Sequence, residues 1–235
     1  MSCLAIIPAR GGSKRIPRKN IKGFLGKPII AYSIEAALDS GIFDEVMVST
    51  DDCEIAEVAR EYGASVPFFR SAETSTDTAG TVPVLVEVLG EYAKHGKNFE
   101  YVCCIYPCAP FVTATKLREG MEMLVALQAD SVFPVVKYSY PPQRCLVIRG
   151  ERVEMLNSES YNMRTQDFEA LYHDAGQFYF AKRESLLTEG KLYCKHSLPL
   201  VMPETEVQDI DSEEDWKIAE IKYQVVMRGS DYKQI

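Results

Sequence analysis

A short apolar run that leads into a basic, glycine-containing segment lies near the N-terminus. From residue 6 to residue 20 the sequence reads IIPARGGSKRIPRKN. The adjacent Gly11 and Gly12 allow the backbone to approach an anion closely and to turn its N–H groups toward it, and Ser13 adds a hydroxyl donor. The first 34 residues carry seven positive charges and no acid, although the whole chain has a net charge of -8. This concentration of charge predicts a loop that binds the phosphates of a nucleotide triphosphate.

The two standard phosphate-binding motifs are absent from this segment. The pattern G-x-x-x-x-G-K-[ST] fails because Gly12 is followed by SKRIP and Lys19 precedes Asn20, and no G-x-G-x-x-G occurs. The sequence therefore excludes a Walker-type ATPase and a dinucleotide-binding dehydrogenase. The alternative to a phosphate loop is a solvated loop in which the double glycine only forms a turn.

Two carboxylates separated by one apolar residue occur late in the chain, in the segment VQDID that ends at Asp211. In an extended segment Asp209 and Asp211 project to the same side. Two oxygen ligands suit Mg²⁺, which leaves its other positions to water and substrate phosphates. The alternative is that Asp211 caps the following helix and Asp209 is solvated. Together with the basic loop, the pair predicts nucleotidyl or phosphoryl transfer.

Two further polar groups follow expected strands. The segment from Ser49 to Asp51 is either a ligand contact or a helix cap. The segment YPCAP, which starts at Tyr106, is either a shaped turn at a site or a plain loop.

Strand-like and helix-like segments alternate along most of the chain. The apolar patterns predict strands and helices in the following ranges: strands over 3–8, 45–50, 65–69, 101–106, 131–136 and 177–181, and helices over 28–40, 54–62, 81–95, 114–127 and 211–223, the last capped by Asp211 or Ser212. This alternation predicts an α/β protein with a mainly parallel sheet, helices on both faces and ligands at the carboxyl ends of the strands. Residues 138–172 break the rhythm and predict an arm that packs against a partner or covers the site.

Length and composition limit the possible classes of protein. The 235 residues suit one α/β domain with or without an inserted arm. The acidic total argues against a nucleic-acid partner, which needs an extended positive face. No apolar run reaches about 18 residues and no signal-peptide pattern is present, which predicts a cytoplasmic protein without a membrane partner. Seven scattered cysteines predict reduced thiols, and Cys104-x-x-x-Cys108 lacks the partners of a zinc site.

Several segments together resemble one enzyme family over nearly the whole chain. The segments IPARGGSKRIPRKN, VSTDD, FRSAETSTDTAGT and VQDIDSEEDW resemble the CMP-sialic acid synthetases, also called acylneuraminate cytidylyltransferases. Within that family, CCIYPCAPF, NMRTQDFEALYHDAGQFYF and VQDIDSEEDW are most similar to the bacterial pseudaminic acid cytidylyltransferases. The resemblance implies a Rossmann-like nucleotidyltransferase fold, a single cytidylyltransferase domain over 1–235, and CTP and a nonulosonic acid as substrates. It also implies a homodimer whose dimerisation arm, at about 138–172, reaches the partner's site.

The resemblance also implies roles for individual residues. Arg10, Lys19 and Asp211 are the implied catalytic residues, and Asp209 and Asp211 are the implied ligands of Mg²⁺. With the residues singled out above, the expected substrate-binding residues are Arg10, Gly11, Gly12, Ser13, Lys14, Asn20, Arg70, Asp77, Thr78, Tyr106, Arg164, His173, Asp174 and Gln177.

The choice of sugar is indicated by two departures from the sialic acid enzymes. Where those enzymes have Gln-Pro-x-Ser-Pro, this chain has the YPCAP segment, and an Arg-Pro-Asn run is replaced by residues around Gly176. Tyr106 offers one hydroxyl and a flat ring, whereas glutamine offers both a donor and an acceptor. We therefore expect pseudaminic acid as the sugar. The alternatives are another nonulosonate, such as legionaminic or N-acetylneuraminic acid, and a non-catalytic nucleotide-binding module.

Overall fold

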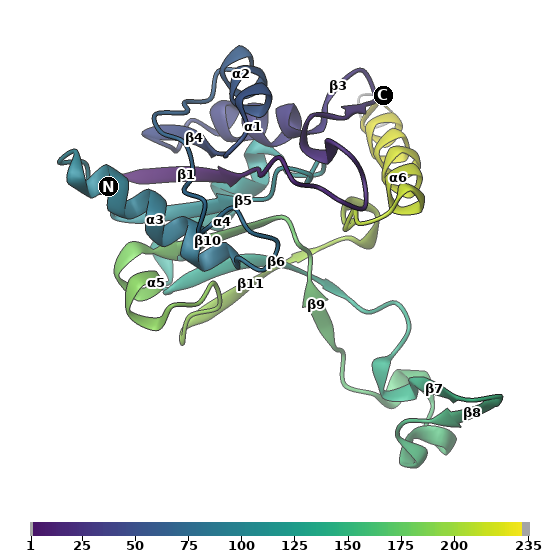
Figure 1. The fold of residues 1–235 in the computed structure, drawn as a ribbon. Coiled ribbons are helices and arrows are strands. Elements are labelled where there is room, and N and C mark those ends of the chain that lie inside the picture. The colour runs from purple at the N-terminus through teal and green to yellow at the C-terminus, as the bar shows by residue number, and fades with distance from the viewer. Residues whose placement is uncertain (1, 232–235) are drawn as a thin grey trace.

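The computed structural model describes residues 2–231, so the ends of the expected 1–235 unit lie outside the described residues. A seven-stranded sheet has the order β11-β6-β10-β5-β1-β4, with β9 paired to β6 (Figure 1). β1 is parallel to β4 and β5, β11 is parallel to β6, and β10 runs antiparallel between β5 and β6. The prediction of a mainly parallel sheet is therefore confirmed. The strands of this sheet are β1 (Cys3–Pro8), β4 (Glu45–Ser49), β5 (Tyr101–Ile105), β6 (Ser131–Lys137), β9 (Tyr172–Asp174), β10 (Phe178–Lys182) and β11 (Ser197–Met202).

Helices cover both faces of the sheet, as the alternating pattern predicts. The central strand β1 is buried on both sides, because its successive side chains point to opposite faces. Cys3, Ala5 and Ile7 pack in the cluster formed with α1, α2 and α4, and Leu4 and Ile6 pack in the cluster formed with α3 and α5. The helices on the two faces are α1 (Ile29–Ser40), α2 (Cys53–Glu61), α3 (Thr81–Lys94), α4 (Ala114–Ala126) and α5 (Arg183–Glu189).

The last helix, α6 (Glu213–Asp231), packs beside the segment that follows β1 (Figure 1). Trp216 contacts Phe24 edge to face with ring centroids 5.6 Å apart, and the buried Ile16 belongs to the same cluster. Ser212 caps the helix: its hydroxyl accepts from Asp215 N (3.2 Å), and the Asp215 carboxylate accepts from Ser212 N (2.8 Å). Asp211 is therefore free of the capping role that the sequence left open. The short strands β2 (Gly23–Phe24) and β3 (Lys27–Pro28) pair with each other beneath this helix.

Two parts of the sheet differ from the sequence prediction. The expected strand over 65–69 is wrong: only Ser65 forms an isolated bridge, to Met47, and Pro67 lacks the N–H that would continue a ladder. The sequence analysis also missed β11, which contains Pro199. A proline inside an apolar run argues against a strand, but it is tolerated where the strand lies at a sheet edge.

Residues 138–172 leave the sheet after β6 and return through β9 (Figure 1). The segment extends away from the sheet and carries a hairpin of β7 (Leu146–Arg149) and β8 (Arg152–Met155). Three short 3-10 helices accompany the hairpin: η2 (Pro142–Arg144), η3 (Ser158–Asn162) and η4 (Thr165–Asp167). No helix within residues 2–231 has the length and apolarity needed to cross a membrane.

Candidate active site

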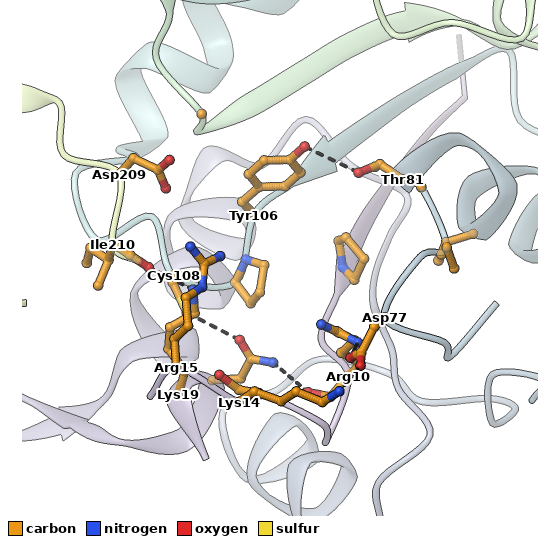
Figure 2. Close-up of a pocket in the computed structure, with 18 of the residues that line it drawn as sticks. Arg10, Lys14, Arg15, Lys19, Asp77, Thr81, Tyr106, Cys108, Asp209 and Ile210 are labelled. Atoms are coloured by element: carbon orange, nitrogen blue, oxygen red, sulfur yellow. Dashed lines mark hydrogen bonds and ion pairs between the residues drawn. The ribbon is translucent and has the colours of Figure 1, made fainter. Parts of the chain in front are cut away.

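A cavity of about 530 Å³ opens at the edge of the sheet where β1 and β5 end (Figure 2). This is the edge at which α/β folds collect ligands. The segment 9–22, called the basic loop here, supplies one side of the cavity, and segments around residues 70–84, 106–108 and 209–210 supply the rest. The lining residues are Pro8, Arg10, Ser13, Lys14, Arg15, Lys19, Asn20, Arg70, Asp77, Ala79, Gly80, Thr81, Val84, Tyr106, Pro107, Cys108, Gly176, Asp209 and Ile210.

Asn20 fixes the two ends of the basic loop relative to each other. It lies in η1 (Lys19–Ile21) and is buried, and its side-chain amide donates to Arg10 O at 2.9 Å. Its amide oxygen accepts from Cys108 Sγ at 3.2 Å, so both polar ends of the side chain are used. Asn20 therefore lines the cavity and also shapes the loop that carries Arg10 and Lys19.

Acidic residues after β4 hold the outer side of the basic loop. Gly11 N donates to Asp51 Oδ1 at 2.9 Å, and a Cβ on Gly11 would lie 2.5 Å from Asp52 Oδ2. Gly11 is thus required by the close approach of Asp52, and its N–H points to Asp51, not into the cavity as the sequence suggested. Asp52 also caps α2 by accepting from Ile55 N at 3.0 Å. The cap of α2 is thus Asp52, one residue beyond the segment from Ser49 to Asp51 for which the sequence offered that role.

Arg18 anchors the same side of the loop in an unusual backbone conformation. Its φ of 57° lies in the left-handed region, which non-glycine residues adopt only when surrounding contacts hold them there. The guanidinium binds Asp52 through two hydrogen bonds, of 2.5 and 3.0 Å, and also pairs with Glu54. The Arg18 hydrogen bond lowers the pKa of Asp52 to about 2. This ion pair holds the basic loop against the start of α2.

The cations of the basic loop are already paired with carboxylates around the cavity. Arg10 and Lys14 both form ion pairs with Asp77, which is on the opposite segment (Figure 2). Arg15 contacts Asp211 Oδ1 at 2.7 Å, and Lys19 lies 3.7 Å from the same oxygen. A polyphosphate entering the cavity would therefore exchange with carboxylate partners. Arg15 was not among the expected site residues, although its position in the same basic run was a usable signal.

Arg70 adds a buried positive charge to the cavity wall. Its Nε donates to Ser49 Oγ at 3.1 Å and its Nη2 donates to Ser49 O at 2.5 Å, which fixes the guanidinium behind the end of β4. Burial lowers the pKa of Arg70 from its usual value. The residue brings positive charge into a site where water screens it only in part.

Tyr106 and Thr81 form a less charged part of the cavity (Figure 2). Their hydroxyl oxygens lie 3.3 Å apart, and burial raises the pKa of Tyr106. The Tyr106 ring lies 5.3 Å from the ring of Tyr179 and is tilted against it. Val84 lines the same cavity. This part offers hydroxyl and apolar contacts, and Thr81 and Val84 were not anticipated because their segment carries no charge.

Asp209 and Asp211 lie beside the cations of the basic loop. Burial and the nearby Asp211 carboxylate raise the pKa of Asp209, and Lys19 opposes that shift. A bound cation would relieve this repulsion, so the pair fits a Mg²⁺ site that takes two carboxylates and completes its shell with phosphate and water. Within residues 2–231 no group of three or more His, Cys, Asp or Glu side chains is placed so that it could hold a metal.

Some expected substrate-binding residues do not line the cavity of their own chain. Gly12 and Thr78 adjoin it without lining it. Arg164 pairs with Asp167 in the extended arm segment, so any contact with a site would be with that of another chain.

The three expected residues around Gly176 do not line the cavity, and their side chains have other partners. His173 is exposed and packs against Tyr138, with ring centroids 4.7 Å apart. Asp174 accepts from Tyr179 OH (2.7 Å) and Gly176 N (2.8 Å), and it also accepts from Tyr193. Gln177 is buried and donates to Glu206 O at 2.6 Å. The turn at Gly176, whose φ is 62°, brings only Gly176 itself into the cavity lining. That His173, Asp174 and Gln177 lie near the bound sugar stays a prediction.

A basic loop that faces Asp209 across a cavity and pairs with Asp211, which does not itself line that cavity, lies at the carboxyl edge of a mainly parallel sheet. Such an arrangement suits nucleotidyl transfer. The chain belongs to the cytidylyltransferase family, whose profile matches residues 4–215.

Individual proteins of known sequence or structure are also similar to this chain. The chain is 43% identical over 226 residues to a pseudaminic acid cytidylyltransferase of Campylobacter jejuni, covering 96% of this chain and 97% of the relative. It is 34% identical over 227 residues to a CMP-N,N'-diacetyllegionaminic acid synthase of Legionella pneumophila, covering 94% and 95%. Its fold matches that of a CMP:2-keto-3-deoxy-manno-octonic acid synthetase complexed with CTP, with a TM-score of 0.68 and 16% identity over 97% of this chain and 100% of the other.

Proposed function

We propose that this protein transfers the CMP group of CTP to a nonulosonic acid, pseudaminic acid, and releases pyrophosphate. The observation that carries the proposal is the single cavity in which Arg10, Lys14, Arg15 and Lys19 face Asp209. The relative from Campylobacter jejuni supports the nucleotide and the sugar. The activity belongs to one cytidylyltransferase unit over 1–235 with its arm at 138–172, and we expect it in the cytoplasm.

The reaction needs mainly positioning and charge neutralisation, as phosphoryl transfer does in general. The anomeric hydroxyl oxygen attacks the α-phosphorus of CTP, a C–O–P link forms, and the bond to the bridging oxygen of pyrophosphate breaks. Arg10 and Lys19 would bind the oxygens on which negative charge develops. The hydroxyl proton leaves to a base, for which Asp211 is our candidate.

Mg²⁺ would be held by Asp209 and Asp211, and when bound it supplies positive charge that polarises a phosphate group. Lys19 would serve both sides of the site, because its ammonium donates to Ile210 O at 2.7 Å while it lines the cavity. A lysine in this position can contact both the segment that carries the two carboxylates and the phosphates of a bound nucleotide.

Sugar choice follows from the less charged part of the cavity. Tyr106, Thr81 and Val84 offer two hydroxyls and an apolar surface, which favours a deoxy sugar over one that carries more hydroxyl groups. A site whose polar groups are left unpaired by the wrong sugar can reject it by up to about 10⁴-fold.

A competition assay tests the proposed substrate. With equal amounts of pseudaminic, legionaminic and N-acetylneuraminic acid, we expect mainly CMP-pseudaminate. The legionaminic acid relative makes CMP-legionaminate the principal alternative product. A mainly legionaminate or neuraminate product would overturn the choice of sugar but leave the cytidylyltransferase proposal intact, whereas absence of CTP-dependent pyrophosphate release with every acid would favour a nucleotide-binding module.

The arm would make the protein a homodimer. The register of the hairpin places Leu146, Ile148, Val153 and Met155 on one face, and the first three are 61%, 75% and 62% exposed. An isolated two-stranded hairpin is at best marginally stable in water, so this apolar face needs a cover. A second copy is the occupant we favour, since closed two-fold pairing is the commonest solution. Arg164, in the same arm, would then be available to the partner's site.

Light scattering tests the dimer. We expect about twice the chain mass of 26.4 kDa at micromolar concentration, and a monomer for Ile148→Asp. The control Glu154→Gln changes the opposite face of the hairpin and should leave the dimer intact. A monomeric wild-type protein would refute the interface without affecting the proposed chemistry.

A further inference from the structure

The residues that carry the carboxylate pair have little regular structure of their own. Between β11 and α6 the chain forms one 3-10 turn, η5 (Glu204–Glu206), followed by an irregular segment through Ser212. We propose that Lys116, Gln177 and Lys222, called the clamp here, act as positioning residues that set Asp209 and Asp211 for a divalent cation. This inference rests on the proposed function, in which the pair holds Mg²⁺.

Gln177, directly before β10 of the sheet, binds the segment between β11 and α6. Its side chain is 2% exposed, and its Nε2 donates to Glu206 O at 2.6 Å. The other end of the amide, Oε1, is buried without a hydrogen-bond partner among the described residues. A buried unpaired acceptor is unfavourable, so stability alone gives no reason to place a glutamine here. The one hydrogen bond that this side chain makes is directed at the segment leading to Asp209.

Lys222 holds the same segment from α6. Its ammonium donates to Val207 O at 2.8 Å and to Glu204 O at 3.2 Å. It therefore binds the carbonyl groups on either side of the one that Gln177 binds. The carbonyl groups of Glu204, Glu206 and Val207 are thus each held by a side chain from another part of the fold, which fixes the path of the backbone before Asp209.

Lys116, in α4, binds a side chain of η5 in the same segment. Its side chain is 13% exposed and forms an ion pair with Glu206. Its Nζ is also 3.4 Å from Phe111 O. Such partly buried ion pairs add little net stability compared with apolar packing. In this protein the pair contributes to where η5 lies. The pair thus ties η5 to the first turn of a helix whose start is itself fixed by the Thr113 cap.

The apolar residues of the segment complete the constraint. Val207 and Ile210 are buried in two different clusters, so they fix the depth of the segment but not its position along the sheet edge. The contacts of Gln177 and Lys222 with backbone carbonyl groups, and that of Lys116 with the Glu206 carboxylate, supply that missing constraint. Groups outside the ligand shell typically change metal affinity by 10- to 100-fold when removed, because they orient the ligands.

The test measures cation binding directly, with Mn²⁺ as the probe and electron paramagnetic resonance of the full chain as the readout. Lys222→Met and Gln177→Met keep the side-chain length and remove the donors. We expect each variant to bind Mn²⁺ about tenfold more weakly than wild type. Gln177→Met also removes the unpaired acceptor, so its Tm should fall little. Lys217→Met, an exposed lysine on the same helix, is the matched control and should bind as wild type does.

A second pair of variants separates positioning from folding. Lys116→Met with Glu206→Met replaces the partly buried ion pair by apolar side chains, which is often neutral for stability. We expect the double variant to keep its Tm and to bind Mn²⁺ about tenfold more weakly. Wild-type Mn²⁺ affinity in the clamp variants, together with loss of binding in Asp209→Asn, would overturn the clamp and leave the proposed metal site standing. Unchanged binding in Asp209→Asn would overturn both.

Discussion

The ion pair between Arg18 and Asp52 is the contact by which the basic loop is fastened to α2, and Asp52→Asn removes its charge while keeping a side chain that can cap the helix. In the folded protein the pKa of Asp52 is lowered to about 2 from an ordinary value of 3.8. At about 1.36 kcal/mol per unit, this shift corresponds to about 2 kcal/mol of stability. That figure is an upper limit, because the Arg18 side chain is 39% exposed and water screens the pair.

The sign of the pH dependence follows from the lowered pKa. A carboxylate whose pKa is depressed by folding stabilises the protein fully above its unfolded pKa, and this contribution is lost as the pH falls through the folded pKa. The stability difference between wild type and Asp52→Asn should therefore be full at pH 7, fall to about half at pH 3, and vanish below about pH 2.

Urea denaturation at pH 7 and at pH 3 measures this difference. At pH 7 the free energy of unfolding of the variant should be lower by about 2 kcal/mol. In a thermal scan this difference corresponds to a Tm lower by about 4–8 °C for a chain of this size. Glu54→Gln is the control: its side chain is 65% exposed and it makes one contact with Arg18, so its effect should stay within about 0.5 kcal/mol. An equal stability loss at both pH values would refute the reasoning, because it would show that the lost energy is not that of the charged carboxylate.

Three further predictions concern the cavity. Asp211→Asn, alone or with Asp209→Asn, should remove nearly all activity, and so should EDTA. The Asp209 change should leave Tm equal or higher, because burial disfavours that charge. Turnover that survives EDTA would end the metal hypothesis. Lys19→Ala and Arg10→Ala should each lower kcat/KM for CTP by about 30-fold, equivalent to about 2 kcal/mol, through lost charge-assisted contacts; near-normal values in both would return the basic loop to a solvated role. Asp77→Asn should tighten the binding of inorganic pyrophosphate several-fold, because Asp77 competes with the ligand for the side chains of Arg10 and Lys14. Calorimetry measures this affinity, and weaker binding would support a direct contact between Asp77 and the substrate.

Much of the architecture could be predicted from local pattern. The apolar run over 3–8, the helical spacing after Pro28 and the stop at Gly41, whose φ is 66°, all appear where the sequence indicates. Such features depend on neighbouring residues, so a linear pattern encodes them. The strand expected over 65–69 failed at Pro67, and β11 was missed, because pairing at a sheet edge depends on partners far away in the chain.

The chemical character of the site was also contained in the sequence. A loop rich in Arg and Lys and the pair Asp209 and Asp211 define phosphate and cation chemistry by composition alone. The tertiary structure decided how these groups are held. Only folding brings Asp52 against Gly11, or brings Gln177 and Lys222 onto the backbone before Asp209 and Lys116 of α4 onto the Glu206 side chain. Residue types determine which chemistry is available, whereas the geometry that makes it usable depends on contacts between segments that are distant in the chain.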